Sequence, residues 1–357
     1  MTAGWGERRA SGPRLSEEQR LAWLRLIRTE NVGPATFRQL LNHFGSAEAA
    51  IAGLPELSRR GGARRVPRII TTAEAEAELA TAARADARFV ALGEPDYPPL
   101  LRLVDGPPPL LAVRGSTNAL ERRSVAVVGA RNASVAGRTM AERIARGLGD
   151  SGLVVVSGLA RGIDAAAHQA ALPSGTVAVL AGGLDRIYPP EHGPLVERIV
   201  EAGGALVSEM PFGWEPRAQD FPRRNRLISG ASLAVVIVEA ARRSGSLHTA
   251  RFALEQGREV FAVPGSPLDP RAEGCNHLIR EGATLTTSAD DVIVGLGPLL
   301  DLPPPDGARE PEATGGPTQE PDDAARDAVV TALGPAPVAV DAVVRHTGLP
   351  VATVLVI

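Results

Sequence analysis

The sequence predicts an α/β protein organised around an open, mainly parallel β-sheet. Two short apolar runs, Val125–Val128 and Leu153–Val156, each lead into a glycine-containing turn, and a helical pattern joins them. Such runs are typical of parallel strands that are buried on both faces and connected by a crossover helix. Similar runs alternate with helical stretches as far as residue 286, which predicts a sheet of six or more strands.

A small helical domain is predicted ahead of the sheet, over residues 15–70. Leucines recur at helical spacing from Leu15 onward. The Gly33-Pro34 pair predicts a turn, with Pro34 starting a helix that Gly45 ends. The pattern resembles a helix-hairpin-helix or SAM-like unit. Such a hairpin contacts DNA backbone in some proteins, but an ordinary helical packing module is the simpler interpretation.

The sheet domain is predicted to span residues 90–295. An Ala/Glu-rich helix over residues 71–86 and a proline-punctuated, extended connector over residues 96–116 lead into it. After the two opening strands, the strand-like runs are Thr176–Leu180, Ala205–Ser208, Leu233–Val238, Val260–Val263 and Ala283–Thr286.

The pattern breaks beyond residue 300. Prolines and acidic residues dominate residues 301–323, which predicts a disordered acidic linker. Residues 324–357 are predicted to form two helices, a turn and the start of a third helix. This is the pattern of a winged-helix domain that stops at Ile357, before its wing.

Two strand-to-helix turns have the character of phosphate-binding loops. Residues 129–131 follow the first strand and residues 157–162 follow the second, and each turn carries glycine and an arginine. Backbone N–H groups of such turns point past the carboxyl edge of a parallel sheet, where a phosphate is bound well. Plain tight turns are the alternative interpretation.

A dinucleotide site is excluded at these turns. Counting from Gly129, Arg131 and Ser134 stand where the G-x-G-x-x-G motif has its second and third glycines. The acid expected at the end of the second strand is replaced by Ser157 or Gly158. The loops therefore favour anion binding without NAD.

Three further stretches carry candidate binding residues. The segment Phe221–Gly230 packs three arginines and an asparagine directly before a buried strand, and guanidinium forks with an amide suit a phosphodiester backbone. Arg243–Ala250 follows that strand and opens a helix, which predicts another anion site at a helix N-terminus. Gly182–His192 places Arg186 and Tyr188 in the loop after the third strand.

The composition limits the classes of function that this protein can have. The net charge is -3 and all 38 basic residues are arginines, so a nucleic-acid surface has to be a local patch. The single cysteine, Cys275, excludes an internal disulfide framework and suits a reducing compartment. Since no apolar run reaches membrane-spanning length and no signal core opens the chain, we expect a cytoplasmic protein with no membrane partner.

Catalytic patterns are sparse. No histidine stands at metal-ligand spacing from another, and a Walker motif is impossible without lysine. Ser157, Asp164 and His168 are close enough in sequence to suggest a triad, but the spacing of Asp164 and His168 favours a pair on a helix surface. We expect no cofactor and no metal.

Six motifs in series resemble the DprA (Smf) family of DNA-processing proteins of natural transformation. They are "SGLARGID", "GGLDRIYP", "FPRRNRLISG", "VEAARRSGSLHTA", "VFAVPGS" and "GCNHLIREGA", in the family's order and spacing over about residues 90–290. The resemblance implies an extended Rossmann-like domain that binds single-stranded DNA, forms a homodimer and loads RecA onto incoming strands, with no chemical step.

The resemblance also implies a set of site residues. With the arginines of the neighbouring loops, the DNA- and phosphate-binding set is Gly129, Arg131, Ser157, Gly158, Arg161, Gly162, Arg186, Arg223, Arg224, Asn225, Arg226, Ser244, Gly245 and Ser246. The apolar residues Leu278, Ile279 and Leu285 are the expected dimer interface. Arg186 stands where relatives often have lysine, which keeps the charge.

An enzyme is the alternative. The extended Rossmann group resembles nucleotide phosphoribohydrolases, which carry a PGGxGTxxE loop with a catalytic glutamate. The nearest segments here, "PGSPLDP" and "SGSLHTA", lack both the second glycine and the glutamate.

Overall fold

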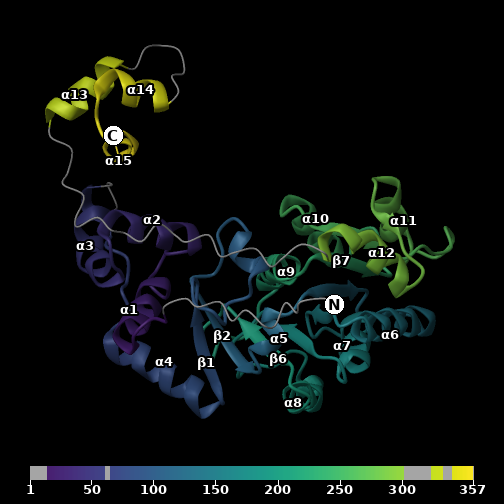
Figure 1. Ribbon diagram of the computed structural model, residues 1–357. Helices are drawn as coiled ribbons and strands as arrows, with labels where there is room; N and C mark the ends of the chain where they lie inside the picture. Colours follow the sequence, from purple (N-terminus) through teal and green to yellow (C-terminus); the bar gives the residue numbers. More distant parts are fainter. Residues whose placement is uncertain (1–13, 61–64, 301–322, 333–339, 357) are drawn as a thin grey trace, which may run out of the picture.

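The computed structural model describes residues 14–60, 65–300, 323–332 and 340–356 of the chain. Within these residues, nine strands form one sheet at the centre of the molecule (Figure 1). The strands are β1 (Ala87–Ala91), β2 (Leu110–Gly115), β3 (Ser124–Gly129), β4 (Val154–Ser157), β5 (Thr176–Val179), β6 (Ala205–Ser208), β7 (Ala234–Val238), β8 (Glu259–Ala262) and β9 (Thr284–Leu285).

The sheet has the order β1-β2-β6-β5-β4-β3-β7-β8-β9. All pairings from β6 to β9 are parallel, whereas β1 pairs with β2 and β2 with β6 in antiparallel fashion. The chain runs outward from β3 through β4 and β5 to β6. It then returns to place β7 on the other side of β3, with Gly129 opposite Val238. The neighbours β3 and β7 therefore form a topological switch point, where open α/β sheets bind ligands.

Helices cover both faces of the sheet. Those of the sheet domain are α5 (Asn118–Glu121), α6 (Val135–Asp150), α7 (Ile163–Ala171), α8 (Gly193–Glu201), α9 (Asp220–Gly230), α10 (Ser246–Glu255), α11 (Glu273–Arg280) and α12 (Ala289–Leu300), with short 3-10 turns η1 (Leu100–Leu103) and η2 (Pro190–His192).

The side chains of β3 show why both faces need cover. Val125 and Val127 belong to the core formed with α6, α7 and α12, whereas Ala126 and Val128 belong to the core formed with α9, α10 and α11. Because successive side chains of a strand point to opposite faces, an uninterrupted apolar run buries both. The mainly parallel α/β sheet predicted from these runs is confirmed.

The N-terminal domain comprises α1 (Glu17–Ile27), α2 (Pro34–Phe44) and α3 (Ala47–Arg60), followed by α4 (Thr72–Arg84). Pro34 is the first residue of α2, and Gly45 ends it with a positive φ of 79°, as predicted.

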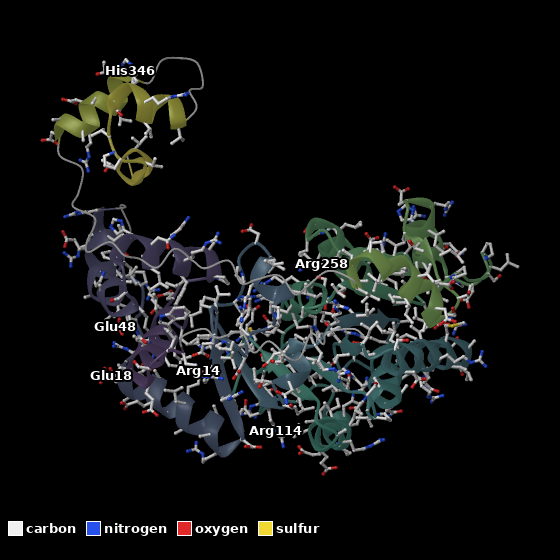
Figure 2. All side chains as sticks on the ribbon, viewed as in Figure 1. Arg14, Glu18, Glu48, Arg114, Arg258 and His346 are labelled. Carbon is white, nitrogen blue, oxygen red and sulfur yellow. The ribbon has the colours of Figure 1, made fainter. Side chains whose placement is uncertain are left out.

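Ion pairs and a hydrogen bond join the N-terminal segment to α4 and to residues beside the sheet. Arg28, which directly follows α1, pairs with Glu78 of α4 at 3.0 Å and donates to the carbonyl of Glu209 at 3.1 Å. Arg14, labelled in Figure 2, pairs with Asp96 at 2.8 Å.

The segment predicted as an extended connector, residues 96–116, contains β2, and β1 lies just before it; the two strands pair antiparallel and extend the sheet beyond β6. The edge strand expected near residue 285 is β9. The acidic linker lies almost wholly outside the described residues.

The C-terminal region contains α13 (Asp323–Ala332), α14 (Val340–Thr347) and α15 (Val351–Val356), which share a cluster of Val329, Val343 and Val354. No helix in the described ranges is both long enough and apolar enough to cross a membrane.

Candidate nucleic-acid interface

A cleft of about 880 Å³ opens at the carboxyl ends of β3 and β7. Its walls include the loop after β3, the loop after β4 with the start of α7, one face of α9, and the loop between β7 and α10, and Tyr188 and Arg271 join them from other segments. Its lining includes Gly129, Arg131, Asn132, Asp164, Tyr188, Phe221, Arg224, Asn225, Arg243, Ser244, Gly245, Ser246, Thr249 and Arg271.

The loop after β3 approaches β7 too closely for any side chain at Gly129. A Cβ there would collide with the carbonyl oxygen of Val238. Ser134 caps α6 by accepting from the N–H of Gly137 at 2.9 Å. The carboxylate of Glu239, at the end of β7, accepts from the N–H of Ser134 at 2.8 Å and also from its hydroxyl. An acidic side chain of the protein therefore occupies the N-terminus of α6.

The N–H groups of the loop after β4 are also bound by an acidic side chain of the protein. One carboxylate oxygen of Asp164, in the first turn of α7, accepts from the N–H groups of Gly158 at 3.1 Å and Ala160 at 3.3 Å. Asp164 is only 5% exposed, and burial raises the pKa of its carboxyl group, while the charge of Arg224 opposes that rise. The N–H groups that the sequence offered to a phosphate are thus engaged by the protein's own carboxylate.

The three arginines of α9 lie in two different environments. Phe221, Arg224 and Asn225 line the cleft. Arg223 and Arg226, on another face of the helix, both pair with the buried carboxylate of Glu209. The sequence placed all three arginines together at one ligand, but only Arg224 lies at the cleft.

Arg224 is buried and holds the walls of the cleft together. Its Nη1 donates to the carbonyls of Gly158, at 2.6 Å, and Val179, and its Nε donates to Asn225 at 3.2 Å. Its Nη2 makes no hydrogen bond within the described structure. Burial lowers the pKa of this guanidinium to about 10, with Asp164 acting against the shift and Arg131 adding to it. Arg224 remains charged at neutral pH.

The loop between β7 and α10 remains open. The hydroxyls of Ser244 and Ser246 lie 2.8 Å apart, and Asn225 donates to the carbonyl of Gly245 at 3.2 Å. Among the described residues, the N–H of Gly245 and the hydroxyl of Thr249 have no hydrogen-bond partner, although Thr249 is only 1% exposed. Since α10 has no acid in its first turn, the N–H of Gly245 is available to an external anion, whereas the N–H groups of Leu247 and His248 donate to carbonyls of the loop itself.

Aromatic rings and an arginine form the rim. The rings of Tyr188 and Phe221 meet edge to face at a centroid distance of 5.5 Å. The guanidinium carbon of Arg131 lies 4.9 Å from the centroid of Phe221. Tyr188 is 47% exposed, so this rim presents both charge and an aromatic surface to solvent.

Comparison with known proteins identifies the family. A family model described as DNA recombination-mediator protein A matches residues 88–297, more than half of the chain. Models described as a DprA-like N-terminal HHH domain and a DprA winged helix domain match residues 17–81 and 311–357. The chain belongs to the DprA family.

Individual relatives agree with this assignment. Protein Smf of Escherichia coli is 48% identical over 202 residues, which cover 56% of this chain and 54% of that protein. The X-ray structure of DprA from Streptococcus pneumoniae matches with a TM-score of 0.66 at 33% identity, over 79% of this chain and 98% of that one. A structure of DprA from Helicobacter pylori, described for its single-stranded DNA binding mode, matches with a TM-score of 0.54 at 29% identity, over 59% of this chain and 96% of that one.

Several of the predicted site residues lie outside the cleft lining. Ser157 is fully buried and donates to the carbonyl of Val127 at 2.7 Å. Gly158 makes room for the guanidinium of Arg224, and Gly162 for the carbonyls of the β3 loop. Arg161 pairs with Glu191, and Arg186 pairs with Glu215 at 3.2 Å.

The three residues expected at the dimer interface differ in their exposure to solvent. Leu278 and Ile279 pack partly buried against the core, whereas Leu285 is 51% exposed on β9.

The pair predicted on a helix surface was wrong. Asp164 and His168 are both buried, and they have separate partners: Asp164 binds loop N–H groups, while His168 lies 2.7 Å from the hydroxyl of Thr176. With Ser157 bonded to Val127, these three residues do not form a catalytic arrangement. No cluster of three metal-ligating side chains occurs in the part of the chain that the structure describes.

The sequence did not predict that Asp164 and Glu239 bind N–H groups at the starts of helices, or that Thr249 lines the cleft. The signal for Asp164 was an acid in the first turn of the helix after a glycine loop. Glu239 gave no local signal, because its target Ser134 is 105 residues away.

Proposed function

We propose that this protein binds single-stranded DNA in the cleft and acts as a cytoplasmic recombination mediator without a chemical step. The observation that carries the proposal is the combination of an open helix N-terminus, a buried guanidinium and an aromatic rim in one cleft. Phosphates suit the first two features, and bases suit the third.

The phosphate would lie at the N-terminus of α10. The N–H of Gly245 and the hydroxyls of Ser244 and Ser246 would supply donors there, with the charge of Arg224 in the same cleft, while Gly129 allows close approach of the backbone. Arg131 and Arg243 have no ion-pair partner within the described ranges and would bind the neighbouring phosphates. Such contacts supply affinity that falls with salt and is the same for every sequence.

The rim favours single strands over duplexes. Tyr188 and Phe221 present ring surfaces on which an unpaired base stacks, and bases in a duplex are already stacked on each other. With 3% aromatic residues in the whole chain, stacking is expected to be sparse and phosphate contact to dominate.

The relatives support the same proposal. The Helicobacter pylori protein is described as binding single-stranded DNA, and the matched family model carries the description of a recombination mediator. By analogy, we propose that the protein protects incoming DNA and loads RecA onto it. A direct test is the rate of RecA filament formation on single strands coated with single-strand-binding protein, with and without this chain.

We further propose that the protein works as a homodimer. The exposed Leu285 on the edge strand β9 makes this end of the sheet a candidate interface. Leu285→Glu is a better test than a change at Leu278, which packs against the core. Light scattering at micromolar concentration should give a dimer for the unchanged chain and a monomer for the variant. A monomer in both cases rejects the dimer.

The DNA-binding proposal is tested by titrating labelled single- and double-stranded oligonucleotides over a range of salt concentrations. Single strands should bind at least tenfold more tightly. Arg243→Gln should weaken that binding and reduce the salt slope by about 0.7. Arg242→Gln is the matched control, because it removes the same charge one residue away from the lining.

Equal affinity for both DNA forms, or equal loss in the two variants, rejects the proposed site. Release of a free base from nucleoside monophosphates would instead support the phosphoribohydrolase alternative.

A further inference from the structure

Thr249, in the first turn of α10, carries a buried hydroxyl group that no other part of the described protein binds. The residue is only 1% exposed and belongs to the lining of the cleft. Its hydroxyl makes no hydrogen bond within the described ranges. A buried hydroxyl without a partner costs free energy, and most buried polar side chains of folded proteins have a partner. An unpaired hydroxyl at the floor of a cleft therefore points to a ligand.

The surroundings explain why this hydroxyl is unpaired. A threonine in a helix commonly donates to the carbonyl four residues earlier, which here belongs to Gly245. That carbonyl already accepts from the side-chain amide of Asn225 and from the N–H of His248, both at 3.2 Å. The hydroxyl of Thr249 is not sealed inside the protein, as the unpaired Nε2 of His168 is, so a partner can reach it from the cleft.

Thr249 lies within one helical turn of the other donors of the proposed phosphate site. Gly245 and Ser246 precede it by four and three residues, a spacing that places residues on one face of a helix with Cβ atoms about 5–6 Å apart. Helical side chains lean toward the helix N-terminus, which brings the Thr249 hydroxyl toward the free N–H of Gly245. A phosphate bridges such a gap with a hydrogen bond of about 2.8 Å on each side.

We propose that Thr249 binds the DNA strand directly, its hydroxyl donating to an unesterified oxygen of the phosphate at the N-terminus of α10. A phosphodiester oxygen only accepts, so the hydroxyl is the donor. Because the residue is almost wholly buried, only an atom at the floor of the cleft reaches it, and the contact fixes how deeply the phosphate enters. This inference rests on the proposed function and adds a residue outside the set expected from the sequence.

The test removes the hydroxyl and the methyl group of Thr249 separately. Thr249→Val keeps the shape of the side chain and removes the donor, whereas Thr249→Ser keeps the donor and removes the methyl group. Fluorescence anisotropy with a labelled single-stranded oligonucleotide should show at least a fivefold loss of affinity for Thr249→Val and less than a twofold loss for Thr249→Ser. The salt slope should stay the same in both variants, because neither loses a cation.

Urea unfolding of the free protein should order the variants differently. Valine removes an unpaired buried hydroxyl, so the urea midpoint of Thr249→Val should equal or exceed that of the unchanged chain although its DNA affinity falls. Thr249→Ser should unfold at a lower midpoint, because it loses a buried methyl group.

Thr176→Val is the matched control. Thr176 is also 1% exposed, but its hydroxyl donates to the carbonyl of Val155 at 2.7 Å, and it does not line the cleft. Its loss should therefore lower the urea midpoint and leave DNA affinity within twofold.

The proposal is overturned if folded Thr249→Val binds single strands as tightly as the unchanged chain, or if Thr249→Ser loses as much affinity as Thr249→Val. If Thr249→Val does not fold, Thr249→Ala replaces it in the comparison with Thr249→Ser, since these two variants differ only in the hydroxyl. Equal affinities of the alanine and serine variants then overturn the proposal.

Inorganic phosphate separates this inference from the proposed function. At one phosphate concentration, the unfolding temperature should rise more for the unchanged chain and Thr249→Ser than for Thr249→Val. If this difference is seen but the unchanged chain does not bind single strands, the proposed function fails alone. If single strands bind the unchanged chain and Thr249→Val equally well, only the role of Thr249 fails.

Discussion

Two glycine-containing loops at the edge of the sheet look alike in sequence and differ in structure. The N–H groups of Gly158 and Ala160 in the loop after β4 bind the buried carboxylate of Asp164, whereas the loop after β7 leaves the N–H of Gly245 at the cleft. The local difference is one acid, which is present in the first turn of α7 and absent from that of α10. A glycine loop followed by such an acid is therefore better interpreted as part of the fold, and one without it as a place for a ligand.

The largest expected effect is on the free energy of unfolding, and it is predicted for a glycine of the loop after β4 but not for one of the loop after β7. Gly162 has a φ of 76°, and a Cβ there would collide with the carbonyls of Ala130 and Arg131. Gly162→Ala should cost about 3 kcal/mol of unfolding free energy, from backbone strain and overpacking together. Gly245 has a φ of -61°, and a methyl group at its Cα would meet nothing within 4 Å, so Gly245→Ala should change stability by less than about 0.5 kcal/mol.

Urea unfolding of both variants measures this contrast. If Gly245→Ala lowers the free energy of unfolding as much as Gly162→Ala does, the loop after β7 is also a structural element, and the distinction between the loops fails.

The second prediction concerns how acid pH lowers the stability of the protein through His168, in the helix α7 that follows the loop after β4. Thr176 donates its hydroxyl proton to Val155, so His168 donates from Nδ1 to Thr176. Its Nε2 is buried and makes no hydrogen bond in the described structure. Burial, with smaller contributions from the charges of His192 and Arg224, lowers the pKa of His168 to about 3.

A depressed histidine pKa means that the unfolded chain takes up the proton first as the pH falls. Stability from this group is therefore complete above pH 6.5 and is lost between pH 6.5 and about 3. Lowering the pH from 6.5 to 5 should cost about 2 kcal/mol through His168 alone. Asp164, whose pKa is raised, acts in the opposite direction, so the measurement is the difference between the unchanged chain and His168→Asn. Parallel stability curves for the two would contradict the assignment.

The third prediction compares the contributions to DNA affinity of an arginine that lines the cleft and of one in the loop after β4 that does not. Arg131 lines the cleft and stacks on Phe221, whereas Arg161 pairs with Glu191 outside the lining. Arg131→Gln should weaken single-strand binding about tenfold and reduce the salt slope by about 0.7. Arg161→Gln should leave affinity within about twofold. Fluorescence anisotropy at several salt concentrations distinguishes them, and a reversal of the two effects would move the DNA path to the other loop.

Much of the fold could be predicted because its signals are local. Apolar runs such as Val125–Val128 specify buried parallel strands, and Pro34 and Gly45 specify the ends of a helix. The strands β1 and β2 could not be found this way, because the proline-rich segment between them resembles a connector and the pairing of β2 with β6 is made far away in sequence.

The candidate site was predictable only in its segments. The arginine-rich stretch of α9 contributes Arg224 and Asn225 to the lining of the cleft. Whether Arg224 or Arg226 faces that cleft depends on the rotation of the helix, which Glu209 helps to fix by pairing with Arg223 and Arg226. Pairings between residues far apart in the chain leave no pattern in a single sequence.

The smallest expected effect tests whether binding needs anything beyond the sheet domain. All lining residues of the cleft fall between Val128 and Arg271, and the C-terminal helices share a valine cluster of their own. A unit of this size buries little surface, and the acidic sequence of residues 301–323 repels phosphates. Deleting residues 301–357 should therefore leave the dissociation constant for single-stranded DNA within about threefold, equivalent to ~0.7 kcal/mol. A tenfold loss on deletion would show that the C-terminal helices bind DNA too, and that the open loop before α10 is one part of a longer path.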